Sequence, residues 1–313
     1  MWPRFPLYIP SKGRATHMIT SCALTELGLR HYVVVEPQQF EQYQEAIEQR
    51  RLLATVLPLD ISYKDTYELC DDLGHVRSTG PGPARNFAWE HAKAAGHAWH
   101  WVMDDNIQGF FRMHRNVRIK AQTPVVFSAM EDFVLRYANV AMAGPNYTMF
   151  AFGASALPPY ITNTRIYSCN LIRNDVPFRW RGRYNEDTIL SLDMLKAGWC
   201  TIQFNAFLQQ KLGTQRIGGG NTAEFYHAES SSINVNGYGD TGTYAKSEML
   251  VRAHPDCSRL VFKYGRWHHH VDYGGFKHTR LIRDQSVNIP DGANEYGMEL
   301  VRLHEKARSA QEG

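Results

Sequence analysis

Several features that mark particular classes of protein are scarce or missing in this 313-residue sequence. No apolar run approaches the roughly 20 residues that a membrane-spanning helix needs, and the N-terminus 1–6 does not resemble a signal peptide. The five cysteines are odd in number, widely spaced and without a CxxC pair. This pattern argues against a disulfide framework or a cysteine zinc site and favours a reducing compartment. We therefore expect a cytoplasmic protein without a membrane anchor.

A strong charge of either sign is also missing. The 34 Lys and Arg residues against 31 Asp and Glu residues give a net charge of +3. A protein that depends only on neutralising phosphates is usually more basic, so a nucleic-acid partner would require clustered charge. Hydrophobic residues make up 43% and charged residues 21%, which is typical of a folded globular chain. We expect disorder only at the termini.

Apolar runs alternate with helical stretches through the first hundred residues. The pattern predicts strands at 6–9, 31–35, 54–57 and 98–103. It predicts helices that end near 27 and that cover 40–51 and 84–95. Because strands and helices alternate, this half is expected to form a parallel sheet with helices on both faces.

The rest of the chain is predicted to continue the same domain. We expect helices at 125–141, 186–197 and 243–253, and strands at 166–172, 201–207 and 259–264. The polar stretch 218–242 is long for a loop in a compact domain, which is typical of a functional or disordered segment. The predicted catalytic domain covers 1–290, with a donor half at 1–106 and an acceptor half at 107–290. A C-terminal helix and tail are expected at 291–313.

A cluster of oxygen-bearing side chains, Asp104, Asp105 and Asn106, follows the predicted strand 98–103. Ligands bind open α/β sheets at the carboxyl ends of the strands. Two adjacent acids repel each other unless a cation neutralises them, and Mg²⁺ or Mn²⁺ combines carboxylate oxygens with substrate phosphates. Taken alone, Asp-Asp-Asn is more often a helix cap or a solvated turn, so the surrounding motifs decide between the two interpretations.

Four motifs in order resemble the glycosyltransferase A fold. They are IPSKGR at 9–14, GPARNFA at 82–88 leading to WVMDDN at 101–106, SCNLIR at 168–173 and NEDTIL at 185–190. Together they cover roughly residues 5–205. The resemblance implies a Rossmann-like α/β fold with a mixed sheet flanked by helices, a nucleotide-sugar donor such as a UDP-sugar, and a Mn²⁺ or Mg²⁺ cofactor.

The resemblance also implies a metal site. It makes Asp105 the main protein ligand and Asp104 a nucleotide contact, although the two roles could be exchanged. Asn106 stands where the family motif ends in an acid, and is the point of departure. The family commonly adds a late histidine, for which His268 and His270 are candidates because alternate residues of a strand share one face.

The donor is expected to contact the loop after the first strand, where Lys12 and Arg14 can meet phosphate oxygens and backbone N–H groups can assist. Arg85 begins a helix, where a cation is unfavourable for the helix dipole, so it indicates either an anionic partner or a surface salt bridge. Glu36 could hydrogen-bond the base or ribose. The nucleotide-sugar contacts predicted are Pro10, Ser11, Lys12, Gly13, Arg14, Glu36, Arg85 and Asp104.

Asp187 is the candidate general base, with Glu186 orienting the site. An inverting transfer needs a carboxylate that removes a proton from the attacking hydroxyl. Acids are also favourable at a helix N-terminus for purely structural reasons. The sequence leaves inversion and retention open, because a base and a covalent nucleophile can both be carboxylates.

The segments 241–247 and 260–268 resemble phage glycosyltransferases associated with TET/JBP-type dioxygenases. This implies transfer to 5-hydroxymethylpyrimidines in DNA, in the cytoplasm of an infected host. Basic segments at 112–120, 179–183 and 277–283 are compatible with phosphate binding. Trp180 could stack on a base that is flipped out of the duplex, and Arg181 and His227 are further candidate acceptor contacts.

Three alternatives to a DNA glycosyltransferase remain. A related enzyme could act on a polysaccharide, a lipid or a protein, but it would more often carry a membrane anchor. A nucleotidyltransferase would share the fold and the metal, but the loop at 10–14 is too short for its phosphate-binding loop. A non-catalytic DNA-binding module would need neither Asp105 nor Asp187.

Overall fold

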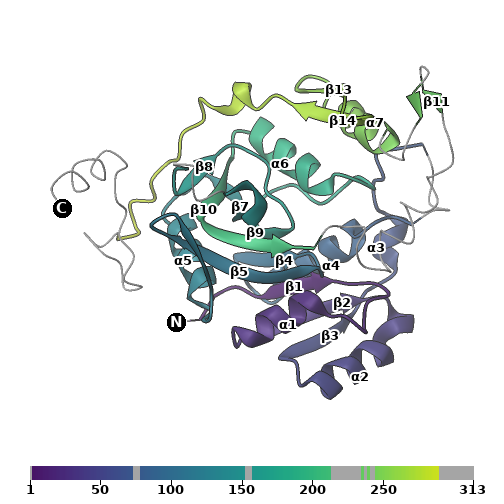
Figure 1. The fold of residues 1–313 in the computed structure, drawn as a ribbon, viewed down its shortest axis with the longest axis vertical. Helices are drawn as coiled ribbons and strands as arrows, with labels where there is room; N and C mark the ends of the chain where they lie inside the picture. Colours follow the sequence, from purple (N-terminus) through teal and green to yellow (C-terminus); the bar gives the residue numbers. More distant parts are fainter. Residues whose placement is uncertain are drawn as a thin grey trace.

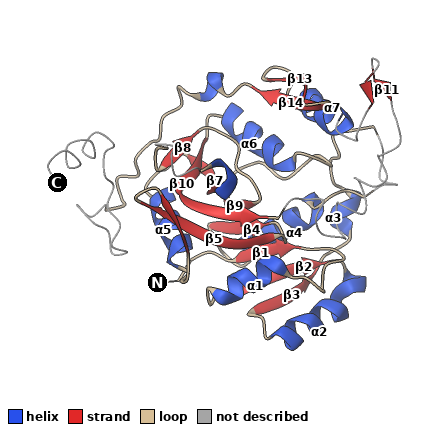
Figure 2. Ribbon diagram, viewed as in Figure 1, coloured by secondary structure: helices blue, strands red, loops and turns tan. Residues whose placement is uncertain are grey.

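The computed structural model describes residues 2–72, 78–151, 157–212, 234–235, 238–239 and 244–288. Its centre is a ten-stranded sheet with the order β3-β2-β1-β4-β9-β7-β10-β5-β6, and β8 pairs with β10 (Figures 1 and 2). The strands are β1 (Leu7–Pro10), β2 (His31–Val35), β3 (Ala54–Pro58), β4 (Trp99–Met103), β5 (Ile107–His114), β6 (Val117–Lys120), β7 (Val140–Tyr147), β8 (Tyr160–Thr162), β9 (Cys169–Arg173) and β10 (Cys200–Lys211).

The pairing pattern makes this a mixed sheet. Strands β3, β2, β1 and β4 are parallel neighbours, so their carboxyl ends share one edge, where ligands bind in open α/β sheets. Strand β9 is antiparallel to β4 and to β7, whereas β7 and β10 are parallel. The parallel half follows the strand–helix alternation of the sequence, and the whole agrees with the expected mixed sheet flanked by helices.

Helices cover both faces of the sheet (Figure 1). On one face Leu24 and Phe127 pack against the strand residues Leu7 and Trp101. On the other face Trp89 and Leu190 join a cluster with Val102. The main helices are α1 (Ile19–Glu26), α2 (Phe40–Arg50), α4 (Gly82–Ala94), α5 (Val125–Val134), α6 (Glu186–Lys196) and α7 (Tyr244–Ala253), and α3 (Ser62–Asp65) is a single turn.

The C-terminal part of the described chain adds a small layer beyond α6. The hairpin of β13 (Ser258–Lys263) and β14 (Arg266–Val271) and helix α7 lie together at the top of Figure 1. Met249 and Leu250 of α7 pack against Ile189 and Leu192 of α6. This layer carries the histidines of segment 268–270.

Close packing fixes the start of α4, the helix that carries Arg85. Gly82 lies so near the ring of Tyr67 that an added Cβ would be 1.8 Å from the phenol oxygen. Tyr67 is itself buried and donates a hydrogen bond of 2.8 Å to the backbone oxygen of Gly182. A side chain at position 82 would therefore displace the first turn of α4.

One helix expected from the sequence is shorter in the structure. The helix expected over 125–141 ends at Val134, and the following residues Val140–Ala143 are completely buried in β7. Their apolar run fits a central strand as well as a helix. The segment 107–120, left without a prediction, forms the β5–β6 hairpin. His227, most of the loop 218–242 and the predicted tail 291–313 lie outside the described residues.

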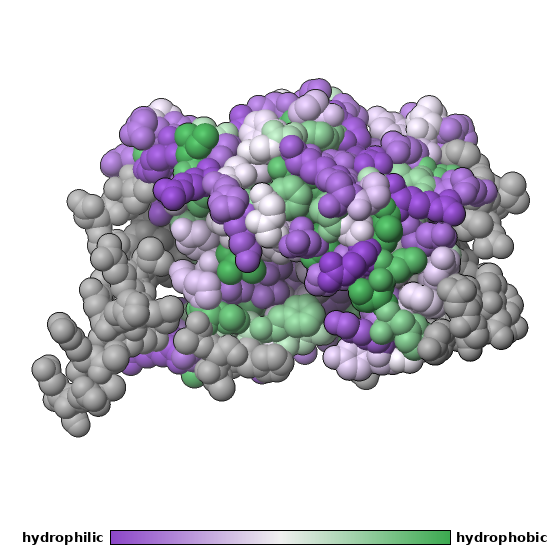
Figure 3. Space-filling view, turned by 90° about the horizontal axis from the view of Figure 1, so that it is seen from above, coloured by the Kyte–Doolittle hydropathy of each residue, from purple (hydrophilic) through white to green (hydrophobic). Residues whose placement is uncertain are grey.

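In the ranges that the structure describes, every helix is too short or too polar to cross a bilayer. Figure 3 shows that hydrophilic residues cover most of the described surface on the side seen from above, with small groups of hydrophobic residues between them.

Candidate functional site

A cleft of about 770 Å³ lies at the carboxyl ends of β1, β2 and β4. Its volume is in the range of ligand-binding pockets. The loops after these strands, the first turns of α4 and α6 and the end of β10 form its walls. Most of the predicted donor, metal and base residues line it: Pro10, Ser11, Lys12, Arg14, Glu36, Arg85, Asp104, Asp105, Asn106, Glu186 and Asp187. Four separate sequence motifs thus meet in one cavity.

Asp105 is held by the loop that follows β1. Ser11 donates a hydrogen bond of 2.8 Å from Oγ to Oδ2 of Asp105, and Arg14 forms an ion pair with Oδ1. The hydroxyl of Tyr43 fixes this loop, because it contacts Ser11 Oγ at 2.8 Å and accepts from the Arg14 backbone N–H at 2.9 Å. Burial raises the pKa of Asp105, and the charge of Arg14 opposes that effect.

Asp104 is clamped by two cations. Arg85 Nη2 lies 2.6 Å from its Oδ1, and Lys211 Nζ lies 2.5 Å from its Oδ2. Burial alone would raise the pKa of Asp104, but the charges of Lys211 and Arg85 outweigh it and hold the pKa well below the usual range. Asp104 is therefore a stable anion at neutral pH.

Arg85 joins this carboxylate to the start of α6. It is 2% exposed, and its Nη1 lies 2.7 Å from Asp187 Oδ1 and 3.4 Å from Glu186 Oε1. The guanidinium also stacks on the ring of Trp180 at 4.5 Å. The cation at this helix start therefore pairs with carboxylates from two other elements, whose charges, together with the Trp180 ring, offset the unfavourable helix dipole.

The position of Trp180 corrects one expectation. Its ring is 1% exposed and one face is covered by Arg85, so it has no free surface on which a base could stack. Arg181 is similarly committed, with hydrogen bonds of 2.8 and 2.9 Å to Asp193. The predicted acceptor contacts Trp180 and Arg181 are therefore structural residues in this conformation.

Asp187 is fixed at the cleft wall by three donors. Besides Arg85, the backbone N–H of Ser168 lies 3.2 Å from its Oδ2 and Asn170 Nδ2 lies 3.2 Å from its Oδ1. Glu186 beside it has its pKa raised to about 7 by burial, with the charge of Asp187 adding to the shift and Arg85 opposing it. The pair therefore offers an oriented carboxylate next to a carboxyl group that titrates near neutrality.

Lys211, which the sequence analysis did not identify, completes the cluster. It ends β10, and its Nζ contacts Ser168 Oγ at 2.8 Å as well as Asp104. Ser168 in turn contacts the hydroxyl of Tyr147 at 2.7 Å. The sequence does contain a signal for Lys211: it is a charged residue at the end of a buried strand, as Asp104 is.

Asn106 and Glu36 occupy different ends of the cleft. Asn106 donates from Nδ2 to the Leu212 backbone oxygen at 3.1 Å, while its buried Oδ1 has no hydrogen-bond partner among the described residues. Glu36 pairs with Lys12 at 3.0 Å and with Lys64. Burial raises the pKa of Glu36, but the two lysines outweigh this effect and lower the pKa below its usual value. Gly13 does not line the cleft; its backbone N–H donates to Gln39 Oε1 at 3.1 Å.

The late histidines are not brought to Asp105. His268 and His270 lie on β14, and neither lines the cleft. His270 instead borders a separate pocket together with His269. The structure thus does not support either residue as part of the metal site.

The three basic segments differ in what they can bind. In the segment 179–183 each arginine has a carboxylate partner, Glu90 for Arg179, Asp193 for Arg181 and Asp71 for Arg183. These are internal ion pairs and not a phosphate-binding strip. The segment 112–120 forms the exposed end of the β5–β6 hairpin, and 277–283 is largely exposed.

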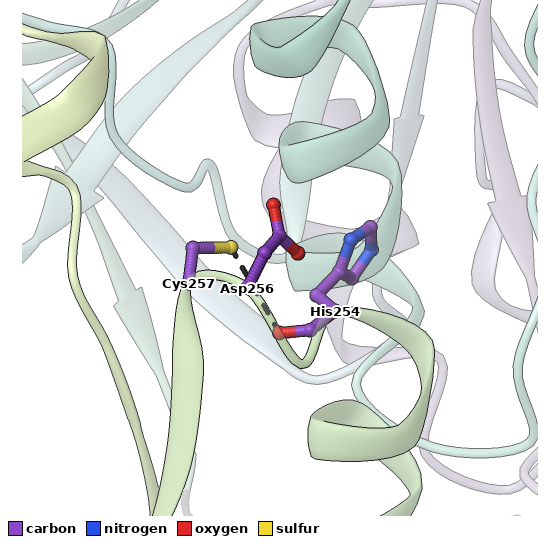
Figure 4. A group of neighbouring side chains, drawn as sticks. All are labelled: His254, Asp256 and Cys257. Atoms are coloured by element: carbon purple, nitrogen blue, oxygen red, sulfur yellow. Dashed lines mark hydrogen bonds between the residues drawn. The ribbon is translucent and has the colours of Figure 1, made fainter.

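A second group of potential metal ligands, His254, Asp256 and Cys257, follows α7 (Figure 4). Their donor atoms lie within 4.8 Å of one another, but none lines the cleft. Asp256 pairs with Lys196 at 2.5 Å, and His254 Nε2 lies 3.6 Å from Asp193. Cys257 Sγ faces the His254 carbonyl oxygen (Figure 4). Through these contacts the three residues connect α6 to the segment between α7 and β13, which accounts for their proximity without a metal ion.

Comparison with known protein families identifies the family of this chain. A model described as TET-Associated Glycosyltransferase matches residues 5–220. The matched range contains the residues of the cleft from Pro10 to Lys211. No curated protein matches the chain.

The raised pKa of Glu186 makes a prediction about stability. The folded state keeps the Glu186 proton up to about pH 7, whereas an unfolded glutamate loses it near pH 4.5. Protonated Glu186 therefore contributes fully to the free energy of unfolding below pH 4.5, and this contribution is lost as the pH rises to 7. Glu186→Gln should remove this dependence, which amounts to at most about 3 kcal/mol. Urea unfolding at several pH values measures it.

Glu48→Gln is the matched control, since Glu48 is exposed on α2. That variant should keep the wild-type slope of unfolding free energy against pH. Glu131, whose pKa burial also raises to about 7, remains in both variants, so the slope should decrease without vanishing. An unchanged slope in Glu186→Gln would contradict the assignment.

Proposed function

The chain belongs to the TET-associated glycosyltransferase family, and on this premise we propose that it transfers a sugar from a UDP-sugar to the hydroxyl of a 5-hydroxymethylated pyrimidine in DNA. Glycosyltransferase activity follows from the family. The donor nucleotide, the metal and the DNA acceptor are the parts that we propose. We place the reaction in the cytoplasm of a phage-infected host, as the sequence resemblance suggests.

One observation carries the proposal. Arg14, Arg85 and Lys211 face the carboxylates of Asp104, Asp105 and Asp187 in a single cleft. Arg14 and Lys211 can exchange their internal ion pairs for contacts with an incoming diphosphate, because charge-assisted hydrogen bonds to phosphate oxygens are strong. Glu36 and its lysines, at the end of β2, are then available to the base and ribose.

The proposed reaction uses Asp187 as the general base. The acceptor oxygen forms a bond with the anomeric carbon while the bond from that carbon to the diphosphate oxygen breaks. The hydroxyl proton passes to Asp187, and the bonding electrons leave with the nucleoside diphosphate. Arg85, Ser168 and Asn170 hold the Asp187 carboxylate in one orientation, which is the positioning that proton transfer needs.

Lys211 and Arg14 are suited to the charge of the leaving group. Lys211 is held between Asp104 and Ser168, and its pKa is raised above the usual range because the charge of Asp104 outweighs the effect of burial. It is therefore cationic at neutral pH. Preorganised cations at the site of developing negative charge are a major source of rate enhancement.

A divalent cation fits the residues beside this cluster. Asp105 and Asn106 Oδ1, which has no hydrogen-bond partner among the described residues, are hard oxygen donors of the kind that Mn²⁺ and Mg²⁺ prefer. When bound, the ion would neutralise charge on the diphosphate. Because Arg14 and Ser11 already contact both oxygens of Asp105, we expect tight metal binding only together with the donor.

The decisive experiment offers duplex DNA that contains 5-hydroxymethylcytosine to the purified chain with a UDP-sugar and Mn²⁺. Mass spectrometry of the nucleosides should show hydroxymethylcytosine that has gained one sugar residue. Unmodified DNA should gain nothing, and a chelator should stop the transfer. Equal transfer with the chelator would contradict the metal proposal, and no transfer with a panel of UDP-sugars would contradict the donor or acceptor.

Asp187→Asn tests the general base. The asparagine has the size of the aspartate but carries no charge, so its contact with Arg85 is weaker than the ion pair. It cannot accept the proton of the acceptor hydroxyl. We expect kcat to fall roughly 10²- to 10⁴-fold, with calorimetric binding of the UDP-sugar retained. Asp175→Asn, which alters an exposed partner of Arg173, should keep normal turnover. A near-normal kcat for Asp187→Asn would remove Asp187 from the role.

A further inference from the structure

A second pocket, of about 400 Å³, adjoins the cleft. Tyr167 lines both cavities, so the two share a wall. The pocket is bordered by the segment before β9, the turn η2 (Thr148–Phe150), and β14 with the residues after it. We call it the Arg165 pocket; the residues that matter here are Phe150, Arg165, Tyr167, His269 and Tyr273.

Arg165 makes no direct ion pair with a carboxylate in the described part of the chain, although the more distant charge of Asp187 partly opposes the effect of burial on its pKa. Its guanidinium stacks on the ring of Tyr167 at 4.3 Å, and its side chain makes no ion pair or hydrogen bond with the described residues. Arg14, Arg85 and Arg183, by contrast, each pair with a carboxylate. Burial lowers the pKa of Arg165. A partly buried, unpaired cation is unfavourable alone and suits an anionic ligand.

One further buried polar atom of this pocket, Nδ1 of His269, has no hydrogen-bond partner among the described residues. The buried Tyr273 hydroxyl lies within reach of the Arg165 backbone N–H as a donor, but its own proton has no acceptor there. Burial, reinforced by the charge of Arg165, lowers the pKa of His269 to about 4, so the imidazole is neutral at pH 7. Buried polar groups are normally paired, and a polar ligand would provide the missing partners.

Aromatic rings line the path between the two cavities. Tyr167 stacks on Tyr147 with ring centroids 5.4 Å apart and an angle of 28° between the planes. Phe150, 5.8 Å from Tyr147, is 52% exposed at the edge of the pocket. Exposed aromatic faces beside a cation are the usual surface for the bases of an unpaired strand.

The β5–β6 hairpin, which carries the basic segment 112–120, lies next to the edge of the pocket at Phe150. Arg118 of β6 donates a hydrogen bond of 3.1 Å to the Thr148 backbone oxygen, which ties the hairpin to η2. Arg115 and Arg118 are exposed. Positive charge therefore borders the exposed ring of Phe150, as expected for a surface that receives a phosphate backbone.

We propose that the Arg165 pocket is the acceptor subsite and takes one nucleotide unit of a DNA strand, with Arg165 bound to a phosphodiester and the exposed ring of Phe150 against the base. The inference rests on the proposed function. His269 and Tyr273 hydrogen-bond polar groups of the same nucleotide. Tyr167, as the shared wall, places this nucleotide beside the cleft that holds Asp187.

Arg165→Gln tests the subsite. Binding of a fluorescent hydroxymethylcytosine oligonucleotide is followed by anisotropy at several salt concentrations, and KM is measured with the same DNA. Loss of one charged hydrogen bond should raise Kd and KM roughly 10- to 100-fold, and the slope of log Kd against log salt should decrease by about 1. Calorimetric affinity for the UDP-sugar should stay unchanged, and Arg165→Lys should restore part of the DNA affinity.

Arg173→Gln is the matched control, because Arg173 also stacks on an aromatic ring, Trp199 at 5.2 Å, but pairs with Asp175. It should bind DNA like the wild type. Phe150→Ala provides a second test that does not depend on the folding of the arginine variant, since this ring is half exposed. It should also weaken DNA binding several-fold.

The outcomes separate this inference from the function on which it rests. If the wild-type chain glycosylates DNA while Arg165→Gln and Phe150→Ala match it in Kd, KM and salt slope, the subsite is wrong and the function stands. If the wild type neither binds the oligonucleotide nor modifies it, both proposals fail. Weakened DNA binding with unchanged donor binding supports the subsite.

Discussion

The cleft depends on the buried guanidinium of Arg85. It joins Asp104 at the end of β4 to Glu186 and Asp187 at the start of α6, two elements that are far apart in the chain. Like charges brought this close would repel without a cation between them. Removing one partner from such a buried network leaves uncompensated charge and commonly costs 3–5 kcal/mol. Arg85 therefore stabilises the same geometry that the proposed chemistry requires.

The packing around Arg85 explains why this cation is placed so firmly. Trp180 lies against one side of the guanidinium, and the contact between Gly82 and Tyr67 fixes the first turn of α4. Lys211 pairs with the second oxygen of Asp104, and Arg14 pairs with Asp105. The resting site is thus an internally compensated set of ion pairs, which a diphosphate can enter by exchanging partners and without a large rearrangement of the backbone.

The sequence predicted the part of this site that arises from local pattern. The β2 boundaries, 31–35, agree with the structure, and the motifs at Asp104, Arg85 and Asp187 meet in one cleft. Two features of the structure could not be predicted from the sequence. Trp180 was expected at the surface, because a segment with three arginines gives no sign that each has an acidic partner elsewhere. Arg165 gave no signal, because its significance is that no described carboxylate forms an ion pair with it, which only the fold reveals.

We infer that Arg85 supports sugar transfer by bridging two groups of carboxylates and not merely by its charge. Arg85→Lys tests it most directly, because lysine keeps the charge but cannot reach Asp104 and Asp187 with separate nitrogen atoms in one plane. The measurement is the rate of sugar transfer at saturating donor and acceptor, on a variant shown to be folded by its thermal unfolding. We expect the rate of sugar transfer to fall at least about 100-fold. Transfer at the wild-type rate would contradict it.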